Sequence, residues 1–142
     1  MAVRTSEAEW IGGLTDGKGT MKLGSGAYQG AYSFSSRFEQ GIGTNPEELI
    51  GAAHAGCFSM ALALFLGQAG YKPRRVHTVA NVHLDKVGEG FKITRIDLNT
   101  EAEVPGIDNK TFLQHAENAK KNCPVSQALA GVEIRMNAKL AG

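Results

Sequence analysis

At residues 44–60 the chain reads TNPEELIGAAHAGCFSM, and this stretch predicts the start of a long helix. Thr44 or Asn45 can cap the first turn, Pro46 suits the first helical position, and the two glutamates that follow complement the positive end of the helix dipole. Apolar residues then recur at helical spacing until two glycines stop the pattern. We therefore expect a helix over residues 44–69.

The predicted helix is apolar on nearly all its faces, because alanine, glycine and leucine fill the positions between the periodic apolar residues. A helix of this kind is buried on several sides. The short strands that remain in one small chain supply little surface to cover it. A second copy of the chain would supply that surface, so the sequence predicts a homodimer.

Shorter elements flank this helix on both sides. Glycine-rich turns separate scattered β-formers before it, and a hairpin with a bulge after Ile93, two helices and a strand follow it. The expected elements are strands and turns over 1–36, a hairpin over 75–104, an amphipathic helix over 108–121 with Phe112, Leu113, Ala116 and Ala119 inward, a short helix from Cys123 to Ala130, and a strand over 132–140. This order predicts an α+β fold in a single domain, residues 1–142.

The composition is that of an ordinary soluble protein, with 42% apolar residues, 20% charged residues and a net charge of +1. No block of like charges is present, which argues against nucleic acid or an anionic membrane as a partner. The apolar stretch Phe58–Leu66 is too short to cross a bilayer. The N-terminal residues lack the hydrophobic segment of a secretory signal, so we expect a cytoplasmic protein whose cysteines are reduced or cycling.

The two cysteines lie in contrasting settings. Cys57 lies well past the start of the long helix among apolar neighbours, where burial raises the pKa of a thiol and favours an inert one. Cys123 precedes Pro124 at the cap of a short helix, where backbone N–H groups favour a thiolate. Local electrostatics alone selects Cys123 as the more reactive sulfur. The residues leave open whether both are core thiols or whether they form a redox pair.

Arg37 is the cation of most interest beside these thiols. It lies between Phe34 and Phe38, which can draw it partly inward. A desolvated arginine stays charged and can stabilise a thiolate or donate a hydrogen bond to a peroxide oxygen. The alternative is a solvated strand residue paired with Glu39.

Glu47 can orient Arg37, or it can serve only as a partner of the helix dipole, as Glu48 can. Ten residues of sequence separate Glu47 from Cys57, which is about 15 Å along a continuous helix. One chain cannot bring both to one site unless the helix breaks. Our hypothesis is that two antiparallel copies of the helix place Glu47 of one chain near Cys57 of the other; contact between the two within one chain would contradict it.

Metal and cofactor sites have little support in the sequence. His54 and Cys57 have an i, i+3 spacing that could hold a metal ion, but no second pair of ligands completes the set. The glycine-rich turns near the N-terminus match no phosphate-binding or dinucleotide-binding fingerprint. We expect neither a metal nor a cofactor.

Several stretches together resemble the OsmC/Ohr family of thiol peroxidases, named for an osmotically inducible protein. The stretches are Arg37–Glu39, residues 44–62, Leu84–Val87, Gly90–Thr94 and Cys123–Gln127. They cover nearly the whole chain in the family's order and spacing. The organic-hydroperoxide-resistance branch has an earlier arginine in a Gly-Arg-Asp-Gly type loop, whereas the comparable loop, Thr15–Gly19, has none. The resemblance is therefore to the OsmC branch.

The resemblance implies an intertwined α+β homodimer in which two long helices pack between antiparallel sheets built from both chains. It implies an antioxidant stress-response enzyme that reduces organic hydroperoxides and hydrogen peroxide without a cofactor. Cys57 would be the peroxidatic thiol and Cys123 the resolving thiol, with Arg37 activating the thiolate and Glu47 orienting Arg37. A dithiol, of the dihydrolipoyl type in this family, would recycle the Cys57–Cys123 disulfide.

Apolar side chains near these residues would suit an organic substrate, and we expect Phe38, Phe58 and Met60 to line its site. A second hypothesis is a small-molecule-binding or structural dimer on the same scaffold, with inert thiols. A third is a metal-binding protein that uses His54 and Cys57. Peroxide turnover by the wild type and by Cys57→Ser separates the first hypothesis from the others.

Overall fold

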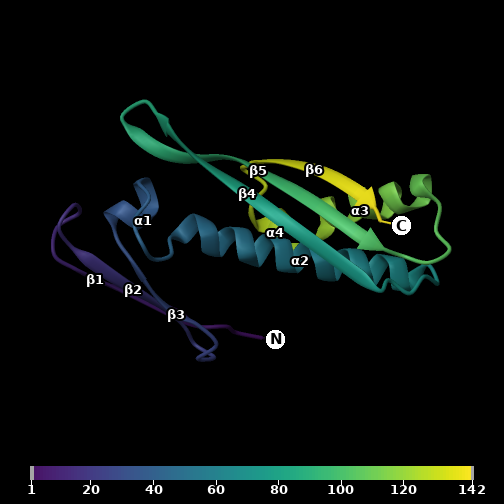
Figure 1. Cartoon of the computed structure of the whole chain (residues 1–142), viewed down its shortest axis with the longest axis horizontal. Coiled ribbons are helices and arrows are strands. Elements are labelled where there is room, and N and C mark those ends of the chain that lie inside the picture. The colour runs from purple at the N-terminus through teal and green to yellow at the C-terminus, as the bar shows by residue number, and fades with distance from the viewer. Residues whose placement is uncertain (1, 142) are drawn as a thin grey trace. The chain divides into compact units, whose positions relative to one another are not determined.

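A computed structural model describes residues 2–141, in which the chain divides into two compact units, Met1–Leu49 and Ile50–Gly142. The elements along the chain are β1 (Ser6–Ile11), β2 (Lys18–Leu23), β3 (Gln29–Tyr32), α1 (Phe34–Phe38), α2 (Pro46–Gln68), β4 (Arg75–Val87), β5 (Gly90–Glu103), α3 (Asn109–Asn122), α4 (Pro124–Ala128) and β6 (Glu133–Leu140) (Figure 1). Sheets and helices in this arrangement confirm the predicted α+β class. That the whole chain forms one domain stays a prediction.

The first unit opens with an antiparallel meander, in the order β1-β2-β3. Gly19 of β2 lies against the rings of Trp10 and Tyr32, whose centroids are 5.3 Å apart, and a Cβ atom at this position would collide with both rings. Glycine therefore lets the aromatic pair close over the strand. Tyr32 also forms a parallel bridge with Thr44, which ties the entry of α2 to this sheet.

The segment after the meander is helical rather than extended. Strands and turns were expected as far as residue 36, but Phe34–Phe38 form the short helix α1. The reason is a capping box: the Ser33 hydroxyl accepts from the Ser36 N–H at 3.1 Å, and the Ser36 hydroxyl accepts from the Ser33 N–H at 2.8 Å. Two serines three residues apart thus override the β-forming phenylalanines beside them.

Helix α2 has the bounds that its end signals predict. The Asn45 side chain accepts from the Glu48 N–H at 2.7 Å and caps the first turn. At the other end Gly70 has a φ of +92°, and the Tyr71 N–H donates to the Leu66 carbonyl at 2.9 Å. This is the left-handed glycine stop that satisfies the last carbonyl groups of a helix. The helix continues from Pro46 to Gln68 between these two caps.

By length and composition α2 could cross a membrane, since it has 23 residues and a mean hydropathy of 1.9 in its most apolar window. The expectation that the apolar stretch is too short was therefore wrong. It counted only Phe58–Leu66, whereas the small residues before that stretch extend the apolar window. A buried core helix has the same composition, and Phe58, Leu62 and Leu66 of α2 are fully buried in the second unit.

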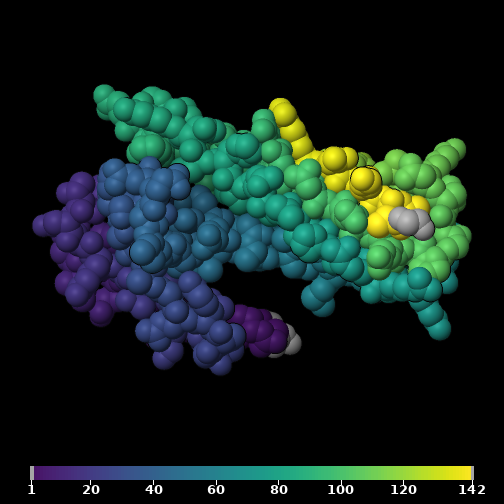
Figure 2. Space-filling model, in the orientation of Figure 1, coloured from purple at the N-terminus to yellow at the C-terminus, as the bar shows by residue number. Residues whose placement is uncertain are grey.

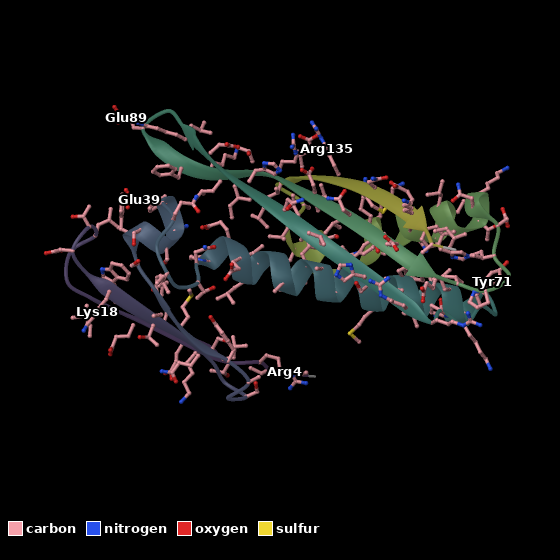
Figure 3. All side chains as sticks on the ribbon, viewed as in Figure 1. Arg4, Lys18, Glu39, Tyr71, Glu89 and Arg135 are labelled. Atoms are coloured by element: carbon pink, nitrogen blue, oxygen red, sulfur yellow. The ribbon has the colours of Figure 1, made fainter. Side chains whose placement is uncertain are left out.

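The second unit contains a three-stranded sheet in the order β4-β5-β6. Its β4–β5 hairpin has the predicted bulge, because Leu84 pairs with Ile93 while His83 pairs with Arg95. The hairpin tip, marked by Glu89 in Figure 3, extends past β6 and forms a projecting lobe in Figure 2. The charged and glycine residues of the tip suit a solvated turn.

The expectation of purely antiparallel sheets was wrong for this unit, because β6 pairs with β5 in parallel. The physical reason is the connection between them. Helices α3 and α4 carry the chain back along the sheet before β6 begins, and such a crossover returns the next strand in the same direction. The sheet is therefore mixed.

The core lies between this sheet and two helices. Phe58, Leu62 and Leu66 recur every four residues on α2 and pack with alternate residues of β5 and with α3; the partners are Ile96, Leu98, Ala102, Phe112, Ala116 and Ala119. Each large side chain buried in this way stabilises the fold by about 1.5–3 kcal/mol. Leu113, which was expected in this core, is 39% exposed because it lies one residue beyond the buried stripe of α3.

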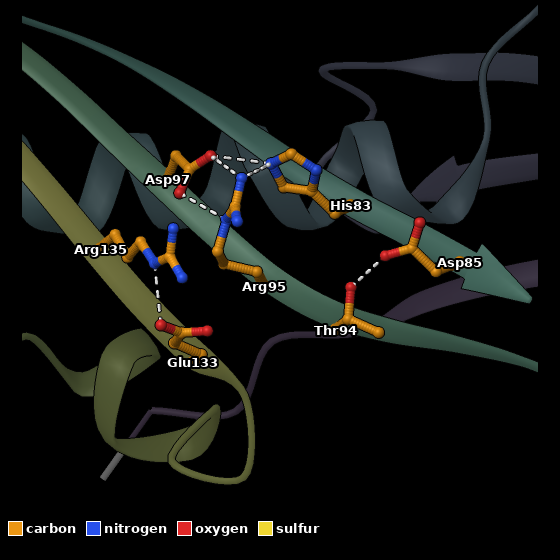
Figure 4. Close-up of polar contacts among 7 residues, drawn as sticks. All are labelled: His83, Asp85, Thr94, Arg95, Asp97, Glu133 and Arg135. Carbon is orange, nitrogen blue, oxygen red and sulfur yellow. Dashed lines mark hydrogen bonds and ion pairs between the residues drawn. The ribbon is translucent and has the colours of Figure 1, made fainter. Parts of the chain in front are cut away.

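The opposite face of the sheet is polar. Asp97 of β5 accepts from His83 at 2.8 Å and forms an ion pair with Arg95 at 2.9 Å, and Arg135 pairs with Glu133 at 2.8 Å on β6 (Figure 4). The hydrogen bond from His83 is the largest effect on Asp97 and, with weaker contributions from Arg95, holds the pKa of Asp97 below its usual range, although desolvation acts in the opposite direction. These pairs mark a solvated face, which leaves the candidate chemistry on the helix side of the sheet.

Candidate active site

Both cysteines lie in the second unit. Cys57 is on α2, and Cys123 is at the junction of α3 and α4. Cys123 ends α3, where its N–H donates to the Ala119 carbonyl at 3.0 Å, and it also caps α4 ahead of Pro124. Its sulfur accepts from the Ser126 N–H at 3.3 Å. The predicted helix cap is thus confirmed. The Cys123 side chain is fully buried.

The burial of the two thiols is the reverse of what their local settings suggest, because Cys57 is half-buried and Cys123 is fully enclosed. Cys57 lies on α2 between residues of the core and residues of an open face: Phe58 is fully buried, whereas Met60 is 77% exposed. Cys123 is enclosed because the turn between two packed helices surrounds it. The idea that Cys57 is the deeper thiol was therefore wrong.

The structure brings the two cysteines together although 66 positions separate them in the sequence. Burial raises the pKa of Cys57, and the neighbouring Cys123 raises it further through a hydrogen bond and through charge. The Val125 N–H, which reaches the same sulfur from α4, acts in the opposite direction, and the balance is upward. Both thiols are free. A cation would be needed to make Cys57 a thiolate near neutral pH.

Two further residues belong to this cluster and were not selected from the sequence as parts of a thiol site. His54 is fully buried on α2, and its Nε2 lies 2.7 Å from the Ser126 hydroxyl. That hydroxyl lies 3.2 Å from the Cys123 sulfur. Burial lowers the pKa of His54, which favours the neutral imidazole. The available signal was spacing, since His54 lies one helical turn before Cys57 and Ser126 one turn after Cys123.

Arg37 and Glu47 are brought together in the first unit. The Arg37 guanidinium donates two hydrogen bonds to the Glu47 carboxylate, from Nε at 3.0 Å and from Nη2 at 2.9 Å. Glu47 is buried, with 9% of its side chain exposed, whereas 37% of the Arg37 side chain is exposed. A two-point contact of this kind fixes the plane of the guanidinium. The alternative in which Arg37 is a strand residue paired with Glu39 was wrong on both points, because α1 turns it toward Glu47.

The three apolar residues expected at the substrate site have different surroundings. The Phe38 ring lies 5.3 Å below the Arg37 guanidinium and contacts the ring of Phe34. Met60 is exposed on α2. Phe58 has no exposed surface and belongs to the core, so the expectation that it lines the site is corrected to a packing role.

Over residues 2–141, no three His, Cys, Asp or Glu side chains are grouped as a metal site would require. His54 and Cys57, the pair that prompted the metal hypothesis, each have another contact in the structure. His54 directs Nε2 to Ser126, and Cys57 interacts with Cys123 and Val125.

Comparison with known proteins gives the family. Residues 39–137 match the family model described as OsmC-like protein. The chain is 52% identical to "Peroxiredoxin OsmC" of Escherichia coli (strain K12) over 96% of both chains, and 33% identical to an "Organic hydroperoxide resistance protein" of Xanthomonas axonopodis pv. citri over 64% of this chain and 63% of that protein.

Solved structures show the same fold. An OsmC-like protein from Mycoplasma pneumoniae aligns with a TM-score of 0.77 at 15% identity and covers 99% of both chains. An organic hydroperoxide resistance protein from Legionella pneumophila aligns with a TM-score of 0.71 at 22% identity over 100% of both chains. The full-length similarity and the family match together show that this chain belongs to the OsmC-like family.

Proposed function

We propose that the protein is a thiol-dependent peroxidase that reduces organic hydroperoxides, and also hydrogen peroxide, through Cys57. The observation that carries this proposal is the contact between two free thiols, of which Cys57 is half-buried and Cys123 fully buried. A partly exposed thiol is open to a peroxide, and a buried neighbour is positioned to react with the oxidised product. The names of the relatives, a peroxiredoxin and an organic hydroperoxide resistance protein, support the same chemistry.

The first step oxidises Cys57. Its thiolate attacks one peroxide oxygen, so that an S–O bond forms and the O–O bond breaks. The sulfur loses two electrons and becomes a sulfenic acid, while the leaving alkoxide takes a proton and departs as an alcohol. With hydrogen peroxide, the leaving group departs as water.

The second step forms a disulfide. Cys123 attacks the sulfenic sulfur of Cys57, an S–S bond replaces the S–O bond, and the hydroxyl leaves as water with the proton from the Cys123 thiol. A dithiol reductant then restores both thiols by exchange and is itself oxidised to a disulfide. We propose a dihydrolipoyl-type protein as this partner and the cytoplasm as the compartment.

Activation of Cys57 is assigned in this proposal to Arg37. Within one chain burial and Cys123 raise the pKa of Cys57, so a positive charge is required to favour the thiolate. Arg37 carries that charge, and Glu47 holds it in a fixed plane. Helix α2 runs without a break past both Glu47 and Cys57. We therefore propose that Arg37 reaches Cys57 from a second copy of the chain.

A homodimer has support from the surface of α2. Met60 is 77% and Leu64 is 55% exposed on α2, a helix apolar enough by composition to cross a membrane. Exposed apolar side chains grouped on one helix mark an interaction surface. In the proposed intertwined dimer a second α2 covers them, and Met60 and Phe38 line the path of an organic hydroperoxide.

We also infer that the two compact units form a single OsmC-like domain. The family match runs from residue 39 to residue 137 and so crosses the boundary between the units at Leu49 and Ile50. Helix α2 crosses the same boundary. A domain that completes its core in a dimer would show this division in a single chain.

Peroxide consumption with dithiothreitol tests the proposed function. Wild type should consume cumene hydroperoxide catalytically, Cys57→Ser should be inactive, and Cys123→Ser should accumulate a sulfenic acid that a dione reagent traps. Full activity in Cys57→Ser would remove its assignment. If the wild type shows no turnover, the binding or structural dimer with inert thiols becomes the better account.

A further inference from the structure

A chain of buried polar atoms leads from Cys123 to His54. The Cys123 sulfur lies 3.2 Å from the Ser126 hydroxyl, and that hydroxyl lies 2.7 Å from His54 Nε2. Cys123 and His54 have no exposed surface, and Ser126 is only 5% exposed. Elements α2 and α4 therefore enclose a continuous path of three polar side chains next to Cys57.

The hydrogen-bonding capacities give this path a direction. The Cys123 thiol donates to the Ser126 oxygen. The Ser126 hydroxyl proton is then free to point at His54 Nε2, which accepts it when the neutral ring carries its proton on Nδ1. The Ser126 backbone N–H also points at the Cys123 sulfur, at 3.3 Å, where it favours negative charge.

His54 is an unusual residue for a core position. Among the described residues its Nδ1 has no hydrogen-bond partner, although the atom is buried. An unsatisfied buried polar atom is costly and calls for an explanation. A leucine would fill a purely structural position on α2 without this cost, so the contact with Ser126 is the feature that accounts for the imidazole.

We propose that Ser126 and His54 assist the resolving step: Ser126 orients the Cys123 thiol toward Cys57 and takes its proton, and His54, acting through Ser126, is the positioning residue that receives the proton from the serine. The inference rests on the proposed function, because it concerns the reaction between Cys123 and the Cys57 sulfenic acid. It assigns no role to either residue in the attack on the peroxide.

The proton balance of this step is closed. As the Cys123 sulfur bonds to the Cys57 sulfur, its proton moves to the Ser126 oxygen while the serine proton moves to His54 Nε2. The S–O bond breaks and a hydroxide leaves. The serine hydroxyl then passes a proton to the hydroxide and regains one from His54, so that water departs and the imidazole is neutral again. The sulfurs account for all the electrons, and no further reactant is required.

Single-turnover kinetics separates this role from peroxide attack. Reduced protein is mixed with one equivalent of cumene hydroperoxide and quenched with acid, and the sulfenic acid and disulfide forms are counted by mass spectrometry. The variants are Ser126→Ala, Ser126→Thr, which keeps a hydroxyl, and His54→Gln, which keeps a hydrogen bond to Ser126 but accepts no proton. Ser59→Ala is the matched control, since it also removes a serine hydroxyl, one on α2 that contacts Thr78 at 2.8 Å.

Ser126→Ala and His54→Gln should slow disulfide formation by at least about tenfold. This is less than the rate acceleration of about 10²–10⁴-fold that general acid–base catalysis typically gives. Oxidation of Cys57 should keep its wild-type rate, so the sulfenic acid accumulates. Ser126→Thr should restore the second step, and Ser59→Ala should leave both steps unchanged. A wild-type rate of disulfide formation in both Ser126→Ala and His54→Gln would overturn the proposal, as would an equal loss in both steps.

Two outcomes keep this test distinct from that of the proposed function. If the wild type forms no sulfenic acid at all, the peroxidase assignment fails and the relay has no reaction to serve. If Ser126→Ala does not fold, as judged by its thermal unfolding, His54→Gln and Ser126→Thr decide the matter. If His54→Gln and Ser126→Thr both form the disulfide at the wild-type rate, His54 does not take up the proton and the proposal is overturned.

Discussion

Cys57 experiences opposing influences within its own chain. Burial and the Cys123 thiol raise its pKa, and the Val125 N–H lowers it. Burial and, to a smaller extent, Cys123 therefore favour the protonated form of the Cys57 thiol. This explains why the local sequence around Cys57 gives no sign of a reactive sulfur, and why the proposed function assigns its activation to an arginine from elsewhere.

The first prediction at this scale concerns Cys123→Ala. This change removes the hydrogen bond and the charge that raise the pKa of Cys57, so thiolate should form at lower pH than in the wild type. The measurement is the pH dependence of alkylation of Cys57 by iodoacetamide, followed by mass spectrometry. A midpoint that stays in place or moves to higher pH would contradict the contact between the two thiols.

The second residue prediction concerns His54 and acid stability. Burial lowers its pKa from the ordinary value of 6.5, so the unfolded chain binds a proton that the folded chain refuses. The stability that the neutral ring contributes is present above pH 6.5 and is lost as the pH falls through the folded-state pKa. The Tm of wild type should thus decline on acidification below this pH, and His54→Gln should decline less.

Thermal melts over a series of acidic buffers check this. His77→Gln is the matched control, because His77 is exposed on β4. If the Tm of His54→Gln falls as steeply with decreasing pH as the Tm of the wild type, groups other than His54 cause the acid sensitivity. If the Tm of His77→Gln depends less on pH than the Tm of His54→Gln, the exposed histidine, and not the buried one, causes the acid sensitivity.

At the scale of elements, close packing of α2 on β4 fixes where Cys57 lies. A Cβ atom at Gly51 would lie 3.3 Å from the Val82 side chain, so the helix approaches the sheet more closely than a larger residue allows. Gly51→Val should cost about 1–3 kcal/mol of unfolding free energy through overpacking. Gly67→Ala on the same helix meets no atom within 4 Å and should stabilise by up to about 1 kcal/mol.

Urea unfolding of the two variants measures these differences. Because Gly51 lies two turns before Cys57, Gly51→Val should also slow disulfide formation, whereas Gly67→Ala should not. The packing account fails if Gly51→Val is as stable as the wild type.

The elements also show how far the sequence alone could be interpreted. End signals located α2 to within a residue or two, and the change of phase at Ile93 located the bulge. Helix α1 was missed because a capping box between two serines outweighed the β-forming residues beside it. The direction of β6 was missed because strand pairing depends on the path of the chain through α3 and α4.

The candidate site likewise has features that the sequence predicts and features that depend on tertiary packing. The residues of the family motif could be named from the sequence, and so could the pairing of Arg37 with Glu47. The contact between His54 and Ser126 could not, since 72 positions separate them and only the packing of α4 on α2 joins them. The burial order of the two cysteines also depends on tertiary packing, which periodicity along one helix does not reveal.

At the scale of the whole molecule, the proposed function treats two clusters of the chain as half-sites. One holds the thiols and the other holds the arginine with its glutamate, and α2 carries Cys57 and Glu47 ten residues apart. The central claim is that a second copy joins these halves. It predicts that neither half functions without its partner chain, and that complementary defects in two chains can compensate each other.

The most direct test is a heterodimer of two inactive variants, Arg37→Ala and Cys57→Ser, coexpressed with different tags and purified through both. If Arg37 acts across the dimer, one of the two sites contains both an intact arginine and an intact cysteine. The heterodimer should then show about half the wild-type peroxidase activity, while each parent homodimer stays inactive. A heterodimer as inactive as its parents would show that Arg37 and Cys57 act within one chain and would contradict the account.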